Sequence, residues 1–213
     1  MPSLRLAALL VVLLALPALA AQEQRAKARI SNAGFTITAL PLLAAREWGV
    51  FTANGLEIEI ILMQSSIVQA ALSQGDIDYQ AGVGPALDVG SMIDMPGGGL
   101  TAMVKTIQER PAVTKQVIRS LQSAKDEIRK SKPKTLDLIV KLLKMNREAA
   151  GEAYDQFLTT LNPTGIPSRI GMEILVRSIQ SQGRHVDKKV AFTDVADDRL
   201  AIEVAKEMGY KIP

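Results

Sequence analysis

The stretch NGLEIEIILMQSS, residues 54–66, decides the fold class. Asn54-Gly55 is a turn signal, and residues 56–62 alternate apolar and acidic side chains before becoming wholly apolar. This pattern predicts a strand that is covered on both faces, as strands of a parallel sheet are. Ser65 and Ser66 are residue types that cap helices, so they predict a helix over 67–72.

The segments on either side repeat this alternation of strand and helix. Residues 29–30 open an extended segment, residues 41–48 have helical spacing, and residues 77–81 form a third short strand. The order strand–helix–strand–helix–strand predicts a parallel sheet with right-handed crossovers, and therefore an α/β protein. Glu57 and Glu59 share one face of their strand, which we expect to face solvent.

Residues 105–213 are predicted to be mostly helical. Apolar residues recur there at the 3-4 spacing of a helix, and we expect each stripe to pack in the core. Ser168 is the expected N-cap of one of these helices. The stripes are Val113, Val117, Leu121, Ala124 and Ile128; residues 149–161; Met172, Leu175, Val176 and Ile179; and Ala201, Val204, Ala205 and Met208.

The composition argues against several kinds of chemistry. The 213 residues include no cysteine and one histidine, which excludes disulfides, thiol nucleophiles and multi-histidine metal sites. His185 lies in a polar linker, no G-x-S-x-G motif occurs, and residues 97–99 (GGG) lack the Lys-Ser/Thr of a P-loop. We therefore expect no enzyme activity, no metal and no cofactor.

The net charge of +3 is unevenly distributed. Residues 105–148 carry twelve Lys or Arg against five Asp or Glu, whereas residues 46–100 carry one against seven. The basic stretch is typical of solvated helix faces. Because aromatic residues make up only 4% and no nucleic-acid-reading motif is present, we expect no nucleic-acid binding.

The first twenty residues have the pattern of a cleavable signal peptide. Arg5 precedes an apolar run over 6–16, Pro17 ends it, and small residues stand at 18 and 20. A membrane anchor needs about 20 apolar residues, and this run is shorter. We expect cleavage after Ala20 and export of the mature chain.

Small and hydroxyl-bearing residues follow each predicted strand of the first half. They occupy residues 31–38 (SNAGFTIT), 63–66 (MQSS) and 82–85 (GVGP). In an open parallel sheet these loops lie at the carboxyl edge, where ligands bind. Backbone N–H groups at helix starts there favour anions such as sulfonate, phosphate or carboxylate. The alternative is that the loops are ordinary caps and turns.

The order of these segments resembles the substrate-binding proteins of nitrate/sulfonate/taurine-type ABC transporters. The resemblance runs through residues 42–59 (LLAAREWGVFTANGLEIE), 69–78 (QAALSQGDID), 82–85, 94–100 (DMPGGGL) and 108–111 (QERP). It implies a periplasmic-binding-protein-like type II fold with a parallel sheet flanked by helices. It also implies a periplasmic location, a small anionic organic solute and a permease partner at the inner membrane.

That family has two lobes, and this sequence resembles one of them. Residues 21–86 correspond to the N-terminal part of the first lobe and residues 87–213 to its C-terminal part with a helical extension. We expect the second lobe to be absent at a join near Ala86/Leu87, which would leave the solute exposed and weakly held. The ligand-binding residues that the resemblance implies are Asn32, Phe35, Thr36, Gln64, Ser65, Ser66, Gly82, Val83 and Gly84.

Two other functions stay open at this point. The family is similar to proteins that bind or make a pyrimidine precursor of thiamine, although the absence of cysteine weakens an enzymatic role. A remnant that no longer binds solute would instead be an interaction module, self-associating through the lobe edge that the missing lobe exposes.

Overall fold

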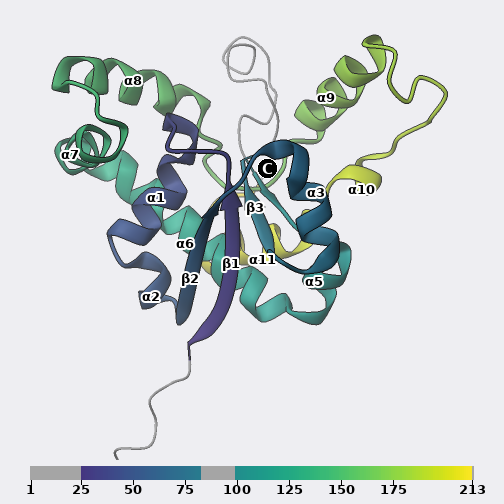
Figure 1. Ribbon diagram of the computed structural model, residues 1–213, viewed down its shortest axis with the longest axis horizontal. Coiled ribbons are helices and arrows are strands. Elements are labelled where there is room, and N and C mark those ends of the chain that lie inside the picture. Colours follow the sequence, from purple (N-terminus) through teal and green to yellow (C-terminus); the bar gives the residue numbers. More distant parts are fainter. Residues whose placement is uncertain (1–24, 83–98, 213) are drawn as a thin grey trace, which may run out of the picture.

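A four-stranded sheet forms the centre of the protein (Figure 1). The computed structural model describes residues 25–82 and 99–212. The strands are β1 (Ala26–Asn32), β2 (Leu56–Leu62), β3 (Tyr79–Ala81) and β4 (Leu100–Thr101), in the order β2-β1-β3-β4. β1 pairs in parallel with both β2 and β3, and β4 is antiparallel to β3. The predicted α/β class and the parallel pairing of the first three strands are confirmed.

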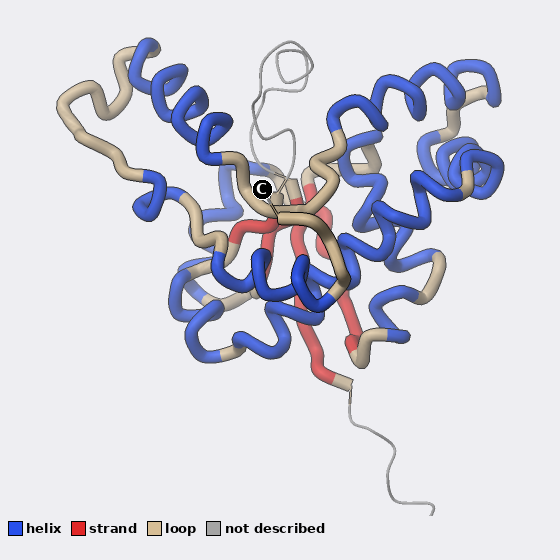
Figure 2. The backbone as a smooth tube through the Cα atoms, turned by 180° about the vertical axis from the view of Figure 1, so that it is seen from behind, coloured by secondary structure: helices blue, strands red, loops and turns tan. Residues whose placement is uncertain are grey.

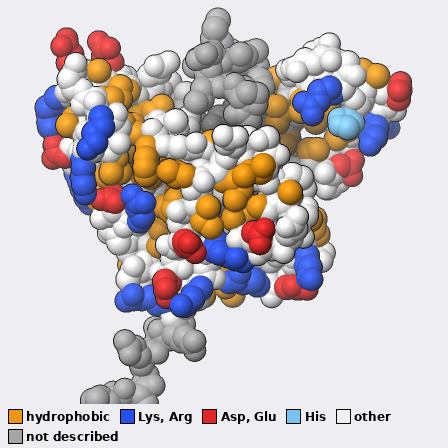
Figure 3. Space-filling view, in the orientation of Figure 1, with side chains coloured by type: hydrophobic (Ala, Val, Ile, Leu, Met, Phe, Trp, Pro, Cys, Tyr) orange, Lys and Arg blue, Asp and Glu red, His pale blue; other side chains and the backbone are white. Residues whose placement is uncertain are grey.

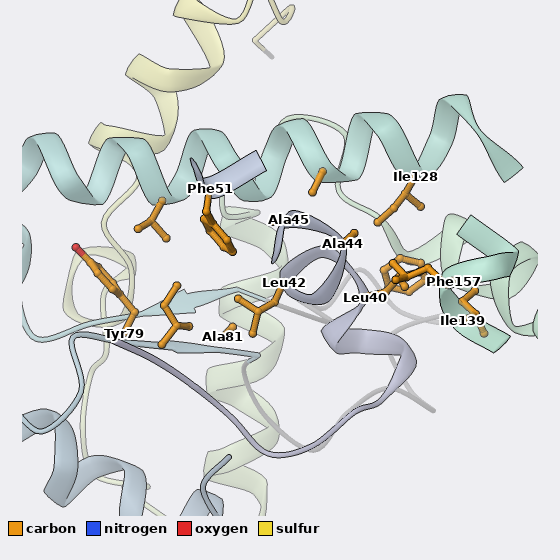
Figure 4. Packing of buried hydrophobic residues seen from close by; sticks show 14 of the residues in the cluster. Leu40, Leu42, Ala44, Ala45, Phe51, Tyr79, Ala81, Ile128, Ile139 and Phe157 are labelled. Atoms are coloured by element: carbon orange, nitrogen blue, oxygen red, sulfur yellow. The ribbon is translucent and has the colours of Figure 1, made fainter. Parts of the chain in front are cut away.

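The main core lies on one face of the sheet. The helices α1 (Leu40–Glu47) and α2 (Val50–Ala53) and the 3-10 turn η1 (Ile37–Ala39) follow β1, and the long helix α6 (Pro111–Lys130) packs against them. Figure 4 shows Leu42, Phe51 and Tyr79 between the sheet and α6. The stripe predicted along 113–128 faces this core, where Val117, Ala124 and Ile128 are fully buried.

A smaller core lies under α3 (Ser65–Gln74) on the other face of the sheet. Val68, Ala71 and Leu72 of this helix pack with Ile77 and with the partly buried Ile61. Since α3 joins β2 to β3, it begins at the carboxyl edge of the sheet and returns the chain to the amino edge.

The second half of the chain is helical, as predicted. In addition to α6 it contains α5 (Val104–Glu109), which precedes α6 in the chain. After α6 come α7 (Lys132–Leu143), α8 (Arg147–Thr160), α9 (Arg169–Ser181), α10 (Phe192–Val195) and α11 (Arg199–Glu207). α7 and α8 extend the main core through Ile139, Tyr154 and Phe157, and α11 packs on α6. Ser168 caps α9 as expected, because its hydroxyl accepts a hydrogen bond from the N–H of Gly171.

The prediction that 56–62 is covered on both faces is wrong. β2 is an edge strand, and only Leu56 of its seven residues is buried. Glu57 and Glu59 are exposed, as expected for the solvent side of the strand. The predicted third strand begins two residues late, at Tyr79, because Ile77 is taken into the core beneath α3.

The prediction that every apolar stripe packs in the core also fails, in α9. Met172, Leu175, Val176 and Ile179 are only partly buried, and Gly171 is the buried residue of this helix. Figures 1 and 2 show why: α9 and α10 extend away from the sheet on the opposite side from α7 and α8. Hydrophobic periodicity identifies an amphipathic helix but not the surface against which it packs.

Three predictions concern residues outside the described part of the chain. The signal peptide over 1–20, the join near Ala86/Leu87 and the site residues Val83 and Gly84 all lie there. Within the described ranges, no helix has the length and apolar character needed to cross a membrane.

Candidate ligand site at the carboxyl edge of the sheet

Asn32, the last residue of β1, holds three strand ends together. Its carbonyl accepts a hydrogen bond from the N–H of Met63 after β2, at 3.0 Å. Its side-chain Nδ2 donates to the carbonyl of Ala81 at the end of β3, also at 3.0 Å, and its Oδ1 accepts from the N–H of Gly34 at 2.9 Å. The loops after β1, β2 and β3 therefore begin at one edge, as predicted.

These bonds give Asn32 a structural role. The family resemblance had implied instead that this residue contacts the ligand. The residue is buried, and both polar atoms of its amide bind the protein itself. The bond to Gly34 is an Asx turn, in which the asparagine side chain bonds to the backbone two residues further on.

The loop after Asn32 exposes Phe35. Its ring is 45% exposed, and the guanidinium carbon of Arg46 on α1 lies 5.9 Å from the ring centroid. The hydroxyl of Thr36 lies 2.8 Å from that of Thr38 and forms a hydrogen bond with it. Thr36 therefore contributes a hydroxyl that is already partnered, and Arg46 brings a positive charge that the sequence analysis did not anticipate.

The start of α3 differs from the prediction at Ser65 and Ser66. They are the first two residues of the helix and not its caps; Gln64 occupies the N-cap position and makes no side-chain capping bond. Gln64, Ser65 and Ser66 are all exposed. The N–H of Ile67 in this first turn donates to the carbonyl of Gln64 at 3.1 Å. The N–H groups of Ser65 and Ser66 have no partner within the helix, because no helical carbonyl precedes them.

Gly82 follows β3 and completes the described part of the edge. Its φ of +96° lies in the region that only glycine adopts readily. Its N–H donates to the carbonyl of Gly99 at 2.9 Å, and a side chain at this position would approach Nδ2 of Asn32 to 4.0 Å. Gly82 therefore lets the backbone turn beside Asn32.

Among the described residues, the best-defined depressions lie away from this edge. The two most distinct depressions among the described residues lie elsewhere: one of about 480 Å³ between α1 and α7, beside Trp48 and Lys134, and one of about 210 Å³ beside Pro111 and Arg199. Neither includes a strand-end residue. A ligand at the edge would keep much of its surface in water.

One buried polar group near the edge is Ser31, which the sequence predicts as the first residue of the loop over 31–38. Ser31 is fully buried, and its hydroxyl makes no hydrogen bond with the described residues. It pairs with Ile61 and Gln80 across the sheet. The structure places Ser31 inside β1 and not in the loop, because the strand continues to Asn32.

The basic stretch over 105–148 is neutralised within the fold. Except for Lys125, Lys130 and Lys144, each of its Lys and Arg residues forms an ion pair with a described Asp or Glu. Figure 3 shows cationic and acidic side chains interspersed over the surface. Among the described residues, no group of three or more His, Cys, Asp or Glu could hold a metal ion.

Comparison with known proteins shows that this chain has a fold similar to that of a solved structure. No model of a known family matches this chain, and no curated protein matches it. The solved structure of a protein from Bordetella bronchiseptica RB50 is similar, with a TM-score of 0.71 and 14% identity. The match covers 87% of this chain and 98% of that chain, so the two share nearly a whole fold.

Proposed function

We propose that this chain is the exported solute-binding component of an ABC transporter, built as a single lobe of the type II periplasmic-binding-protein fold. Its ligand is a small organic anion held at the carboxyl edge of the sheet, and its partner is a permease at the inner membrane. The observation that carries the proposal is the convergence of the three strand-end loops through Asn32.

The chemistry of the edge supports an anionic ligand. Ser65 and Ser66 present hydroxyls and first-turn N–H groups at the start of a ten-residue helix without a capping side chain. Arg46, which forms an ion pair with Glu47 at 3.1 Å, lies beside Phe35. The likeness to the Bordetella protein supports the α/β fold on which the proposal rests, since the match covers 98% of that chain.

The open surface implies weak binding. Ligand sites usually bury 70–90% of a ligand, and a second wall is absent from the described edge. We therefore expect dissociation constants of about 1 mM, which corresponds to about −4 kcal/mol. NMR titration of the isotope-labelled mature chain with methanesulfonate detects binding of this strength and identifies the residues involved.

The expected result is saturable shifts of the amide signals of Gly34, Ser65 and Ser66. The double variant Ser65→Ala/Ser66→Ala should bind about tenfold more weakly, because it loses two hydroxyl donors to a charged group. Ser73→Ala is the matched control: it removes a hydroxyl from the far end of the same helix, where that hydroxyl bonds only to the carbonyl of Gln69.

Two outcomes would contradict the proposal. If none of methanesulfonate, nitrate, phthalate and a pyrimidine gives saturable shifts, the chain does not bind the proposed solutes. Micromolar affinity for any of them would show that a single open lobe captures its solute fully, contrary to the weak binding expected from its exposure.

A further inference from the structure

The strand β2 has a partner strand on one side only. It is the outermost strand in the order β2-β1-β3-β4, and Figure 1 shows it at the outer side of the sheet. Among the described residues, β1 is the only strand that pairs with β2. The other side of β2 therefore presents a row of backbone N–H and C=O groups to any strand that meets it.

The bonds at the two ends of β2 show which residues point outward. The carbonyl of Gly55 accepts a hydrogen bond from the N–H of Ala26, and the N–H of Met63 donates to the carbonyl of Asn32, both at 3.0 Å. Successive residues of a strand direct their backbone groups to alternate sides, so the odd-numbered residues bond to β1. The residues whose N–H and C=O groups point outward are Leu56, Ile58, Ile60 and Leu62.

The devices that usually protect an edge strand are absent from β2. It contains neither proline nor lysine, and its register with β1 runs through all seven of its residues without a bulge. Both of its acids have a basic residue opposite them on β1: Glu57 forms an ion pair with Lys27 at 3.5 Å, and Glu59 pairs with Arg29 in the register. The charge pattern therefore does not favour a basic strand as the partner of this edge.

The sequence of β2 is complementary to itself in one antiparallel register. When Ile60 lies opposite Ile60 of a second copy, Ile58 lies opposite Leu62 and Glu59 lies opposite Ile61. The outward-pointing residues of the two copies then exchange about six backbone hydrogen bonds. The 55% exposed side chain of Leu62 also gains an apolar neighbour on the same face. A register with Glu59 opposite Glu59 would instead place like charges together, which is destabilising.

We infer that two copies of this chain pair through their β2 edges, antiparallel and centred on Ile60, so that the two sheets form one continuous sheet. The carboxyl ends of the two β2 strands then point to opposite ends of the joined sheet, and each copy keeps its own candidate ligand site. Since few residues of each strand pair, the interface is small and the dissociation constant should be about 0.1 mM. The inference does not depend on the proposed function.

Sedimentation equilibrium of the mature chain, at about 10 μM to 1 mM, measures this association. The average mass should rise from that of the monomer towards that of the dimer. Leu62→Asp should weaken the association at least about tenfold, because it brings a charge against Ile58 of the second copy. Val104→Asp is the matched control, since Val104 is also exposed but lies on α5 and not on β2. It should leave the association unchanged.

Cysteine cross-linking tests the register, since the natural chain has no cysteine. In the inferred register, Glu59 and Ile61 of the second copy form a pair without hydrogen bonds, with Cα atoms about 4.5 Å apart, which a disulfide can span. Tagged Glu59→Cys mixed with untagged Ile61→Cys should therefore form a mixed disulfide faster than either variant bonds to itself. Ser73→Cys, at an exposed position of α3, measures cross-linking by random collision.

Four outcomes would overturn the inference. The chain could remain monomeric at about 1 mM. Leu62→Asp and Val104→Asp could weaken the association equally. The mixed disulfide could form no faster than the disulfide of Glu59→Cys with itself, which would exclude the register centred on Ile60. A peptide of alternating lysine and valine could bind the chain more tightly than the chain binds itself, which would show that the edge receives a basic strand and not a second copy.

Discussion

The side-chain Nδ2 of Asn32 donates a hydrogen bond to the carbonyl of Ala81 at 3.0 Å, joining the ends of two strands that are 49 positions apart in the sequence. β3 has only three residues, and its register with β1 includes two residue pairs. A strand this short gains little from its backbone pairing alone. The Asn32 amide therefore supplements the sheet at the point where the candidate site is formed.

Replacing Asn32 with alanine should destabilise the fold by about 1–3 kcal/mol, because it leaves the buried Ala81 carbonyl and the Gly34 N–H without their partner. Urea unfolding followed by circular dichroism measures this. Asn54→Ala is a suitable control, since the Asn54 side chain donates to the carbonyl of Val50, one turn away on the same short helix. A loss no larger than the control's would show that Asn32 does not bind the strand ends together.

Glycine substitutions at two positions should have opposite effects. Gly75 ends α3 with φ of +78°, and no atom lies near its missing side chain, so Gly75→Ala should cost about 1 kcal/mol through backbone strain alone. Gly151 lies inside α8, also with open space around it, so Gly151→Ala should stabilise by about 0.5–1 kcal/mol. Thermal unfolding of both variants checks the signs, and equal signs would contradict this account.

The two apolar stripes of α6 and α9 should respond differently to the same substitution. Ile128 of α6 is fully buried, and Ile128→Ala should cost about 2–5 kcal/mol by leaving a cavity. Ile179 of α9 is partly exposed, so Ile179→Ala should cost less than about 1 kcal/mol. Chemical denaturation of each variant provides the comparison. A large loss at Ile179 would show that α9 has a packing partner beyond the described contacts.

Stability should rise with pH above about 8 through Lys125. Burial, with the nearby charge of Arg129, lowers the pKa of Lys125 from 10.5 to about 8. Between these values the unfolded chain binds a proton that the folded chain has released, so the free energy of unfolding increases with pH. Below pH 8 both states are protonated and the folded state carries the full cost of the buried charge. Lys125→Met should therefore be more stable than the natural chain at pH 7.

The measurement is the difference in unfolding free energy between the natural chain and Lys125→Met from pH 7 to 10.5, which should shrink as pH rises. Taking this difference removes the opposite contribution of Tyr210. The pKa of Tyr210 is raised to about 12 by burial and its bond to Asp126, so that residue lowers stability above pH 10. Lys130→Met, at an exposed position of the same helix, is the matched variant for the loss of a lysine charge.

The local elements and the α/β class could be predicted from the amino-acid sequence alone. Alternating residues over 56–62, the turn signal at Asn54-Gly55 and the helical stripes beyond 105 depend on the period of a strand or helix, which each segment carries within itself. The order of these elements was enough to predict parallel pairing and the meeting of the strand-end loops, because parallel strands share a carboxyl edge.

Only the tertiary structure decided how those elements are used. It placed β2 at the sheet edge, left the stripe of α9 partly exposed, and made Asn32 a connection between strand ends. It also brought Arg46 to Phe35. The physical reason is that burial and hydrogen-bond partners come from segments distant in the chain. The hydrophobic period of a segment and the neighbours of a residue in the sequence do not show which distant segments bury it or bond to it.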